Sequence, residues 1–359
     1  MKKLIKLAVI SLCLGGIIAC TDGANVIDND NQIRDYTEFF SPLPSAAVYP
    51  KDNPHSPAKE QLGELLFWDP ILSGDRNVAC ATCHHPDFGW ADGRPLSVGS
   101  DGLGLGPERI GVETTPFHSP TIMNVAFTGL TSATLVDFTS GGYFWDLRAL
   151  TLEEQALGPI TNPVEMLGYN FSVEEILDEV SHRVANIPKY TELFAAAFDD
   201  KDPINAQNIA KALATFQRKI ISPASRFDLF LQGDITALNE QEIIGLNTFI
   251  DGGCVRCHLG PMLSDNLINE SEAIINDVVV RTPTLRNLSF TAPYMHDGSR
   301  ATLIDALNDY EERDDLEVSV AEGDFPEIEA FLRSLDSAQF YRQKPTSVPS
   351  GLSVGGDID

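Results

Sequence analysis

The sequence predicts an all-α protein whose helices are joined by long loops. Two observations indicate this. Capping boxes, Ser172 with Glu175 and Asn239 with Glu242, each precede apolar residues at helical spacing. Alternation of the kind that marks a strand is confined to residues 277–280. Most of the remaining chain has neither period, so we expect it to form loops.

The expected helices follow in chain order. Ser56-Pro57 starts the first, because serine caps a helix and proline fits its first position. Gly252-Gly253 ends the helix that begins after Asn239. Asp324 is expected to cap the last. The other helices are recognised by apolar residues that share one face: Ile176, Leu177, Val180 and Val184; Ile209, Leu213, Phe216 and Ile220; Leu303, Leu307 and Tyr310; and Ile328, Phe331, Leu332 and Leu335.

Two Cys-x-x-Cys-His pentads stand at equivalent places in the two halves, Cys80 to His84 and Cys254 to His258. The spacing is typical of covalent attachment of haem c, with two thiols for the vinyl groups and a histidine, His84 or His258, for the iron. A zinc ribbon would need further ligands at matching spacing, and a redox dithiol requires no histidine after the second cysteine. The pentads therefore predict two covalently bound haem c groups.

The first 19 residues read as a secretory leader, because three lysines precede an apolar run too short to span a bilayer. Ile17-Ile18-Ala19-Cys20 resembles a bacterial lipobox, which would make Cys20 the lipidated first residue of the mature chain; cleavage nearby with a free Cys20 is the alternative. Thr21 then favours the outer membrane. Localisation is accordingly expected on the periplasmic side, with a lipid anchor.

Loss of the leader leaves 22 basic and 52 acidic residues, a net charge of −30. Such a surface excludes nucleic acid as a natural partner and suits basic partners, or simply a soluble protein. The expected organisation places two cytochrome c-like domains, each wrapped on one haem, between polar ends: residues 1–19 leader, 20–52 tether, 53–222 N-terminal domain, 223–342 C-terminal domain and 343–359 disordered tail.

From about Leu62 to Leu335 the chain resembles the bacterial dihaem cytochrome c peroxidases and their MauG-type relatives. The matching blocks include Phe67-Trp68-Asp69-Pro70, Ser119-Pro120-Thr121, Phe144-Trp145-Asp146, Val164-Glu165-Met166, Thr282-Pro283-Thr284-Leu285-Arg286-Asn287 and Ala292-Pro293-Tyr294-Met295-His296-Asp297-Gly298. The resemblance implies a haem peroxidase in which peroxide reacts at the His84 haem, while the His258 haem transfers electrons.

Catalytic roles follow from the same resemblance. Trp145 matches the tryptophan between the haems, Glu165 the distal acid–base carboxylate and Gln155 its polar neighbour. A carboxylate at an open haem can move a proton between the two peroxide oxygens. The alternatives from the residues alone are a core aromatic for Trp145 and a helix-start glutamate for Glu165.

Two departures from the family pattern concern the iron ligands. Peroxidases that need reductive activation place a blocking histidine sixteen residues after the proximal one, and that position is Ser100 here. The site should therefore be open, unless His118 swings in. Their methionine ligand to the second haem falls at Tyr310, as in MauG-type enzymes. A phenolate favours oxidised iron. Otherwise Tyr310 completes the Leu303/Leu307 stripe and Met262 or Met295 ligates.

Thr291 and Pro293 match carbonyl donors to a calcium ion between the domains, but His118 stands where the family has an asparagine ligand. His296 matches a family histidine near the haems, with an ordering role or simple packing. For His55, His85 and His182 we expect solvation or packing.

These features predict a peroxidase that reduces hydrogen peroxide to water with electrons from a small cytochrome c or cupredoxin. MauG-like long-range oxidation of a protein substrate is the alternative. A non-catalytic dihaem electron carrier is a third hypothesis, which Ser100 and Glu165 disfavour because a carrier needs neither an open site nor a proton shuttle.

Overall fold

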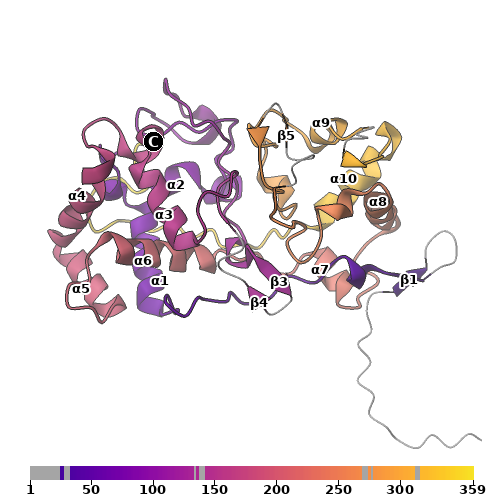
Figure 1. Cartoon of the computed structure of the whole chain (residues 1–359), viewed down its shortest axis with the longest axis horizontal. Coiled ribbons are helices and arrows are strands. Elements are labelled where there is room, and N and C mark those ends of the chain that lie inside the picture. The colour runs from indigo at the N-terminus through magenta and orange to yellow at the C-terminus, as the bar shows by residue number, and fades with distance from the viewer. Residues whose placement is uncertain are drawn as a thin grey trace, which may run out of the picture.

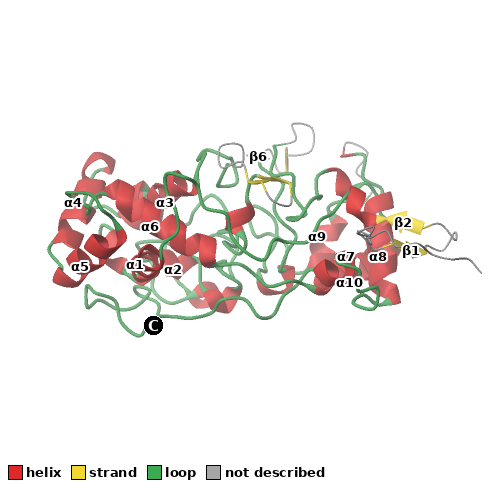
Figure 2. Cartoon of the chain, turned by 90° about the horizontal axis from the view of Figure 1, so that it is seen from below, coloured by secondary structure: helices red, strands yellow, loops and turns green. Residues whose placement is uncertain are grey.

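The computed structural model of the chain describes residues 25–27, 33–132, 135–136, 142–268, 274–275, 278–311 and 316–359. Helices dominate, as expected, and they gather at the two ends of an elongated molecule with a central region of loops (Figure 2). The helices are α1 Pro57–Trp68, α2 Cys80–Cys83, α3 Leu152–Thr161, α4 Val173–Ala185, α5 Pro188–Ala197, α6 Ala206–Lys219, α7 Arg226–Leu231, α8 Glu240–Asp251, α9 Leu303–Asn308 and α10 Phe325–Ser334.

Strands are short in the described residues. They pair as three antiparallel ribbons: β1 Asn25–Ile27 with β2 Ile33–Asp35, β3 Leu130–Ser132 with β4 Leu135–Val136, and β5 Ile274–Ile275 with β6 Val278–Val279. The last ribbon contains part of the predicted strand alternation, of which residue 277 lies outside the described residues. None of the three builds a core layer, so the fold depends on helix packing.

Several predicted helix starts are confirmed by cap hydrogen bonds. The Ser56 hydroxyl accepts from the Lys59 amide at 3.2 Å, and Pro57 is the first helical residue. Asn239 and Glu242 cap α8 reciprocally. Asp324 does precede the first residue of α10, as predicted. Its side chain makes no hydrogen bond to the helix, so the predicted capping is wrong. Helix α9 also ends at Asn308, so Tyr310 lies two residues beyond the helical stripe in which it was expected.

Two large hydrophobic cores form. Helices that precede residue 222 in the sequence build the first, and helices that follow it build the second. The first centres on α1 and α6, which pack so closely that a Cβ on Gly63 would lie 1.9 Å from the carbonyl oxygen of Ala212. The second centres on α8 and α10, where the ring of Phe331 contacts those of Phe227 and Phe249. Figure 1 shows α1–α6 on one side of the molecule and α7–α10 on the other.

The amino-terminal segment corrects the expectation of a tether at residues 20–52. Its first described part crosses to the second core (Figure 1), where Tyr36 and Phe40 are buried. The Leu43 amide donates to Asp228 at 2.9 Å, and the Phe39 carbonyl accepts from the Gly260 amide at 2.7 Å. The buried side chains of Tyr36, Phe40 and Leu43 anchor this otherwise polar segment, although their spacing matches neither a helix nor a strand.

The carboxyl-terminal segment corrects the expectation of a disordered tail at residues 343–359. After α10 the chain returns to the first core (Figure 1), where Phe340 and Val348 are buried. The Ser350 hydroxyl donates to Asp69 at 2.6 Å, and the Gly355 amide donates to the Trp68 carbonyl at 2.8 Å. A Pro/Ser/Gly composition removes helical periodicity but leaves the backbone free to pair with the other half of the chain.

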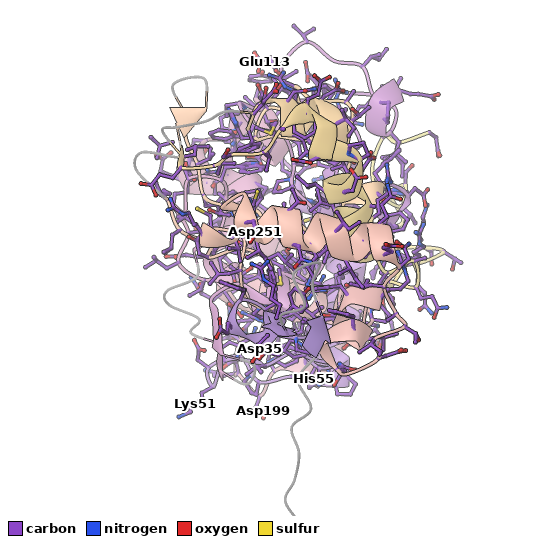
Figure 3. The ribbon with its side chains drawn as sticks, turned by 90° about the vertical axis from the view of Figure 1, so that its right-hand side faces the viewer. Asp35, Lys51, His55, Glu113, Asp199 and Asp251 are labelled. Atoms are coloured by element: carbon purple, nitrogen blue, oxygen red, sulfur yellow. The ribbon has the colours of Figure 1, made fainter. Side chains whose placement is uncertain are left out.

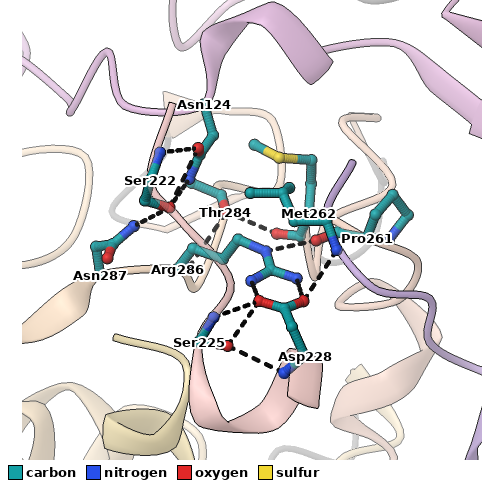
Figure 4. Close-up of polar contacts among 10 residues, drawn as sticks. Asn124, Ser222, Ser225, Asp228, Pro261, Met262, Thr284, Arg286 and Asn287 are labelled. Atoms are coloured by element: carbon teal, nitrogen blue, oxygen red, sulfur yellow. Dashed lines mark hydrogen bonds and ion pairs between the residues drawn. The ribbon is translucent and has the colours of Figure 1, made fainter. Parts of the chain in front are cut away.

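The two halves meet at Ser222, where side chains of both bond to one residue (Figure 4). Asn124 accepts from the Ser222 amide at 2.8 Å, and Asn287 donates to the Ser222 hydroxyl at 3.2 Å. Beside this junction Arg286 and Asp228 form a buried bidentate ion pair at 2.9 and 2.8 Å. These contacts fix the connection between the halves.

The charge excess lies at the surface, as the composition suggests. Asp35, Asp199 and Asp251 are exposed and project from the molecule in Figure 3. Arg34 offsets only one of them, since it pairs with Asp251 at 2.9 Å. An exposed pair of this kind contributes little to stability.

Candidate active site: two cavities beside the pentads

The first pentad forms helix α2 and places its two thiols and its histidine at one cavity. Cys80, Cys83 and His84 all line this cavity, whose other walls include Phe67, Leu213 and Met166. The Nδ1 atom of His84 lies 3.2 Å from the Trp90 carbonyl oxygen. A hydrogen bond at Nδ1 sets the tautomer that leaves Nε2 free as a metal ligand.

The electrostatics of the pentad suit an iron ligand better than a redox dithiol. Burial lowers the pKa of His84 to about 4, so its imidazole stays neutral at neutral pH. Burial raises the pKa of Cys80 to about 12 and that of Cys83 well above its usual range. Reactive dithiols have the opposite shift. All four pentad cysteines are free of disulfides, which leaves each thiol able to form a thioether.

Glu165 and Gln155 line the same cavity as His84. Gln155 comes from α3, and Glu165 from the single π-helical turn Pro163–Leu167 that follows it. Asn162 caps this turn and donates to the Glu165 carboxylate at 2.7 Å. Burial raises the pKa of Glu165, and this outweighs the opposing effects of Arg148 and of the Asn162 hydrogen bond. A raised pKa makes the protonated form of this carboxyl group more accessible than in an exposed glutamate, which suits a group that takes up and returns a proton.

The position of the blocking histidine offers no strong ligand. Gly99 lines the cavity, whereas the Ser100 hydroxyl donates to the Pro163 carbonyl at 3.3 Å. His118, the alternative, has its Nδ1 2.8 Å from the Arg94 carbonyl oxygen and lines the other cavity. Of the residues that line the His84 cavity, His84 is the one histidine in the described chain.

The second pentad opens into a larger cavity of about 250 Å³ with mostly apolar walls. Cys254, Cys257 and His258 line it, and the Nδ1 atom of His258 lies 2.9 Å from the Leu263 carbonyl oxygen. Burial lowers the pKa of His258 and raises that of Cys254 to about 11. The pattern repeats that of the first pentad.

Of the three candidates for a second ligand, two lie at this cavity. Tyr310 and Met295 both line it, whereas Met262 is absent from its walls and offers its carbonyl oxygen to Thr284 at 2.6 Å. Tyr310 leaves α9 through a turn in which its amide donates to the Leu307 carbonyl at 2.9 Å.

The two halves repeat each other around the space between the cavities. Tyr143 bridges to Ala149 as Tyr294 bridges to Arg300. In each loop the tyrosine amide donates to the carbonyl of the later residue at 2.7 Å. Thr151 and Thr302 then cap α3 and α9. In this register Tyr310 corresponds to Pro159, which lines the first cavity. In the same register Trp145 corresponds to His296, although the two side chains are chemically different.

Trp145 and His296 lie together at the centre of this repeat, with ring centroids 6.5 Å apart. The Trp145 indole donates to the His118 carbonyl at 2.8 Å, and the Trp145 carbonyl accepts from the Arg281 amide at the same distance. The His118 amide donates in turn to the His296 carbonyl at 2.8 Å, so His118 links Trp145 to the backbone of His296. The His296 Nδ1 atom is buried without a protein partner. Trp145 is thus held rigidly on the wall of the second cavity.

The residues fit covalent haem at both places. Each cavity combines two thiols that form no disulfide, an imidazole oriented by a backbone carbonyl and apolar walls. No group of three or more histidine, cysteine or acidic side chains converges as a metal site in the described chain, so a zinc ribbon finds no further ligands there.

The remaining predicted residues have simpler surroundings. Thr291 and Pro293 line the second cavity, but the ring of His118 is bonded to Arg94 and offers no oxygen. His85 is buried and packs edge-on against Trp68. His55 and His182 are bonded at the surface, to Glu60 and Asn186.

Sequence reasoning missed two arginines. Arg281 has its guanidinium 5.9 Å from the Trp145 ring centroid, and Arg109 bonds only to backbone carbonyls near the first cavity. Arg281 directly precedes a matching block, which was a usable signal. Nothing in the local sequence distinguishes Arg109 from an exposed arginine.

Comparison with known proteins agrees with this geometry. Residues 57–236 match the model of the di-haem cytochrome c peroxidase family. The chain is 32% identical over 370 residues to cytochrome c551 peroxidase of Nitrosomonas europaea, covering 97% of this chain and 96% of that protein. It belongs to this family. Membership makes it a haem peroxidase, an oxidoreductase, and disfavours the hypothesis of a mere electron carrier.

Other relatives point to both branches of the family. The methylamine utilization protein MauG of Methylorubrum extorquens is 34% identical over 284 residues, 74% of this chain and 72% of its own. A solved MauG-like protein associated with microbial copper homeostasis superposes with a TM-score of 0.66 at 27% identity, covering 82% of this chain and 95% of that one. These similarities do not distinguish the peroxidase branch of the family from the MauG branch, so the distinction depends on the residues that would bind the two irons.

The leader and Cys20 lie outside the described residues. Within the part that is described, no helix combines the length and the apolar character needed to cross a membrane.

Proposed function

We propose that the chain is a dihaem c-type peroxidase that reduces hydrogen peroxide at the His84 cavity. The observation that carries this proposal is the placement of Glu165 and Gln155 on the same cavity as Cys80, Cys83 and His84, with no second histidine among its walls in the described chain. The haem, once attached, supplies the iron that binds peroxide and takes up its oxidising equivalents.

Glu165 acts on protons at the bound substrate. Its carboxylate takes a proton from one peroxide oxygen and returns it to the other, so that the O–O bond breaks with water as the leaving group. Two electrons and two protons complete the reduction of one peroxide to two waters. Burial raises the pKa of Glu165, which keeps the protonated form accessible, and Asn162 holds the carboxylate in place. Gln155 orients the substrate as a neutral hydrogen-bonding group.

Trp145 and Tyr310 serve the second site. Trp145, fixed by the His118 carbonyl, relays the second oxidising equivalent toward the His258 haem. Tyr310 would be the second ligand of that iron. It lines the cavity, as Met295 does and Met262 does not. A tyrosine ligand would suit the MauG-like alternative, oxidation of a protein substrate, while a small cytochrome c or cupredoxin stays the proposed electron donor.

The remaining parts of the proposal rest on sequence. The chain would be exported to the periplasmic side and held there by lipid on Cys20. Calcium at Thr291 and Pro293 gains no support from His118, whose ring is bonded elsewhere, so no step depends on it.

The test replaces Glu165 by glutamine. Glu165→Gln should keep both haems and their spectra while peroxide turnover falls by roughly 10²–10⁴-fold, the usual effect of losing a general acid–base group. Glu154→Gln is the matched control, because Glu154 is an exposed glutamate of the neighbouring α3 whose side chain accepts a hydrogen bond from the Leu150 amide at 2.8 Å. Turnover of Glu165→Gln within a few-fold of wild type would demote Glu165 to a structural residue.

A further inference from the structure

Residues 355–357 lie against the first pentad and the segments on either side of it. The Thr82 hydroxyl, inside the pentad, donates to the Gly355 carbonyl at 2.7 Å. The Asp357 amide donates to the Asn77 carbonyl at 2.8 Å, and the Asp357 carbonyl accepts from the Gly104 amide at 3.0 Å. A C-terminus more than 250 positions away is thus bonded on both sides of the cysteines.

Arg109 connects the same carbonyl to the glycine-rich segment, residues 99–106. Its side chain is 1% exposed and uses all five N–H donors on backbone carbonyls. Four of these belong to Val98, Gly99, Gly102 and Gly104, at 2.7, 2.7, 3.0 and 2.8 Å. The fifth is the Asp357 carbonyl, at 2.9 Å. A planar guanidinium with every donor engaged fixes the path of the segment.

The glycine-rich segment in turn lies directly on the turn that carries Glu165. A Cβ on Gly99 would lie 1.9 Å from the Val164 carbonyl oxygen and 2.3 Å from that of Glu165, so no larger residue fits. Gly99 also lines the His84 cavity. Any shift of the segment would therefore change the cavity wall and the support of Glu165 together.

We propose that residues 356–359 and Arg109 form a brace that holds the glycine-rich segment in place at the wall of the His84 cavity, so that the peroxide site is open in the oxidised protein at rest. Arg109 is a positioning residue, acting through the segment and not on substrate. The inference rests on the proposed function in taking this cavity as the peroxide site. It adds a structural reason why no reductive activation would be needed. The segment at the position of the family's blocking histidine is held by hydrogen bonds to Asp357.

The brace is tested in the full dihaem protein with three variants. A stop after Gly355 removes the Asp357 carbonyl while keeping the buried Val348. Arg109→Lys keeps the charge but not the five-donor fork. Asp357→Asn is the control, because it keeps the main-chain contact and removes only the charge of an exposed side chain.

Hydrogen exchange of residues 99–111 is the first measurement. Losing two hydrogen bonds should speed exchange there by about tenfold in the truncated protein and in Arg109→Lys, with α8 and α10 unaffected. Asp357→Asn should match wild type. Unchanged exchange in both of the first two variants would overturn the brace.

Cyanide association with the His84 haem is the second measurement, because a purely structural role would not alter it. The freed segment should close on the cavity and slow association by about fivefold, the effect of roughly one hydrogen bond, while the His258 haem keeps its spectrum. Unchanged association alongside faster exchange would refute the role in keeping the site open. A wild-type protein that binds no cyanide would instead refute the proposed open site, and the exchange data would still decide whether the brace exists.

Discussion

Arg281 should restrain the oxidation of Trp145. Its guanidinium lies 5.9 Å from the indole ring centroid and its amide donates to the Trp145 carbonyl. A fixed positive charge opposes the appearance of a second one on the indole. At this separation the Coulomb term is about 2.8 kcal/mol for an effective dielectric constant of about 20, and about 0.7 kcal/mol in water. Removing the charge should therefore increase the population of oxidised Trp145 by about 3- to 100-fold.

The variants Arg281→Gln and Arg281→Lys separate charge from hydrogen bonding. Both lose part of the contacts to the Phe144 carbonyl, at 2.9 Å, and to Asn266, at 3.0 Å. Only the glutamine variant loses the charge. If Trp145 relays oxidising equivalents by being oxidised itself, transfer should accelerate in Arg281→Gln and stay near the wild-type rate in Arg281→Lys.

Rapid mixing of the oxidised protein with one equivalent of peroxide provides the assay. The spectral change at the His258 haem reports arrival of the second oxidising equivalent. Equal rates in wild type and both variants would refute the reasoning, because a charge this close must affect an oxidised indole. Equal acceleration in both variants would assign the effect to lost hydrogen bonds.

Two further predictions concern the second half. Tyr310→Met should raise the potential of the His258 haem by on the order of 0.2 V, within the roughly 0.8 V that axial ligands span, and add a thioether charge-transfer band; redox titration with no change would leave Tyr310 as packing. Asp228→Asn should lower the free energy of unfolding by about 3–5 kcal/mol, because Arg286 is left buried without its partner. Burial alone would raise the pKa of Asp228, but Arg286 and the bonds from Leu43 and Ser225 lower it. Its contribution is therefore present above the unfolded pKa of about 4 and lost on acidification through the folded value, so denaturant titrations should show the two proteins converging at low pH. A constant difference down to low pH would contradict this.

Local signals in the sequence predicted most of the helices and the content of both cavities. Capping at Ser56 and Asn239 depends on neighbouring residues alone, and each pentad fixes its own thiols and imidazole. The assignment of Glu165 needed the family resemblance, since its cavity is assembled from α2, α3 and the π-helical turn.

The errors at the two ends of the chain, where a tether and a disordered tail were expected, share one physical cause. Tyr36 and Val348 belong to polar stretches without period, yet each is buried in the core of the opposite half. Contacts across more than 180 positions, such as that of Leu43 with Asp228 or of Arg109 with Asp357, leave no local trace in the sequence. Each uses a backbone group that every such residue carries, the Leu43 amide in one and the Asp357 carbonyl in the other. Tyr310 was assigned to a helix that ends two residues earlier, since the turn after Asn308 preserves the apolar spacing.

The state of the His84 haem in the oxidised protein as isolated tests the central claim most directly. An open cavity with Ser100 turned to the Pro163 carbonyl predicts one high-spin ferric signal in the EPR spectrum and prompt binding of peroxide, before any reduction. A wholly low-spin spectrum, with peroxide reactivity gained only after one-electron reduction, would contradict the account.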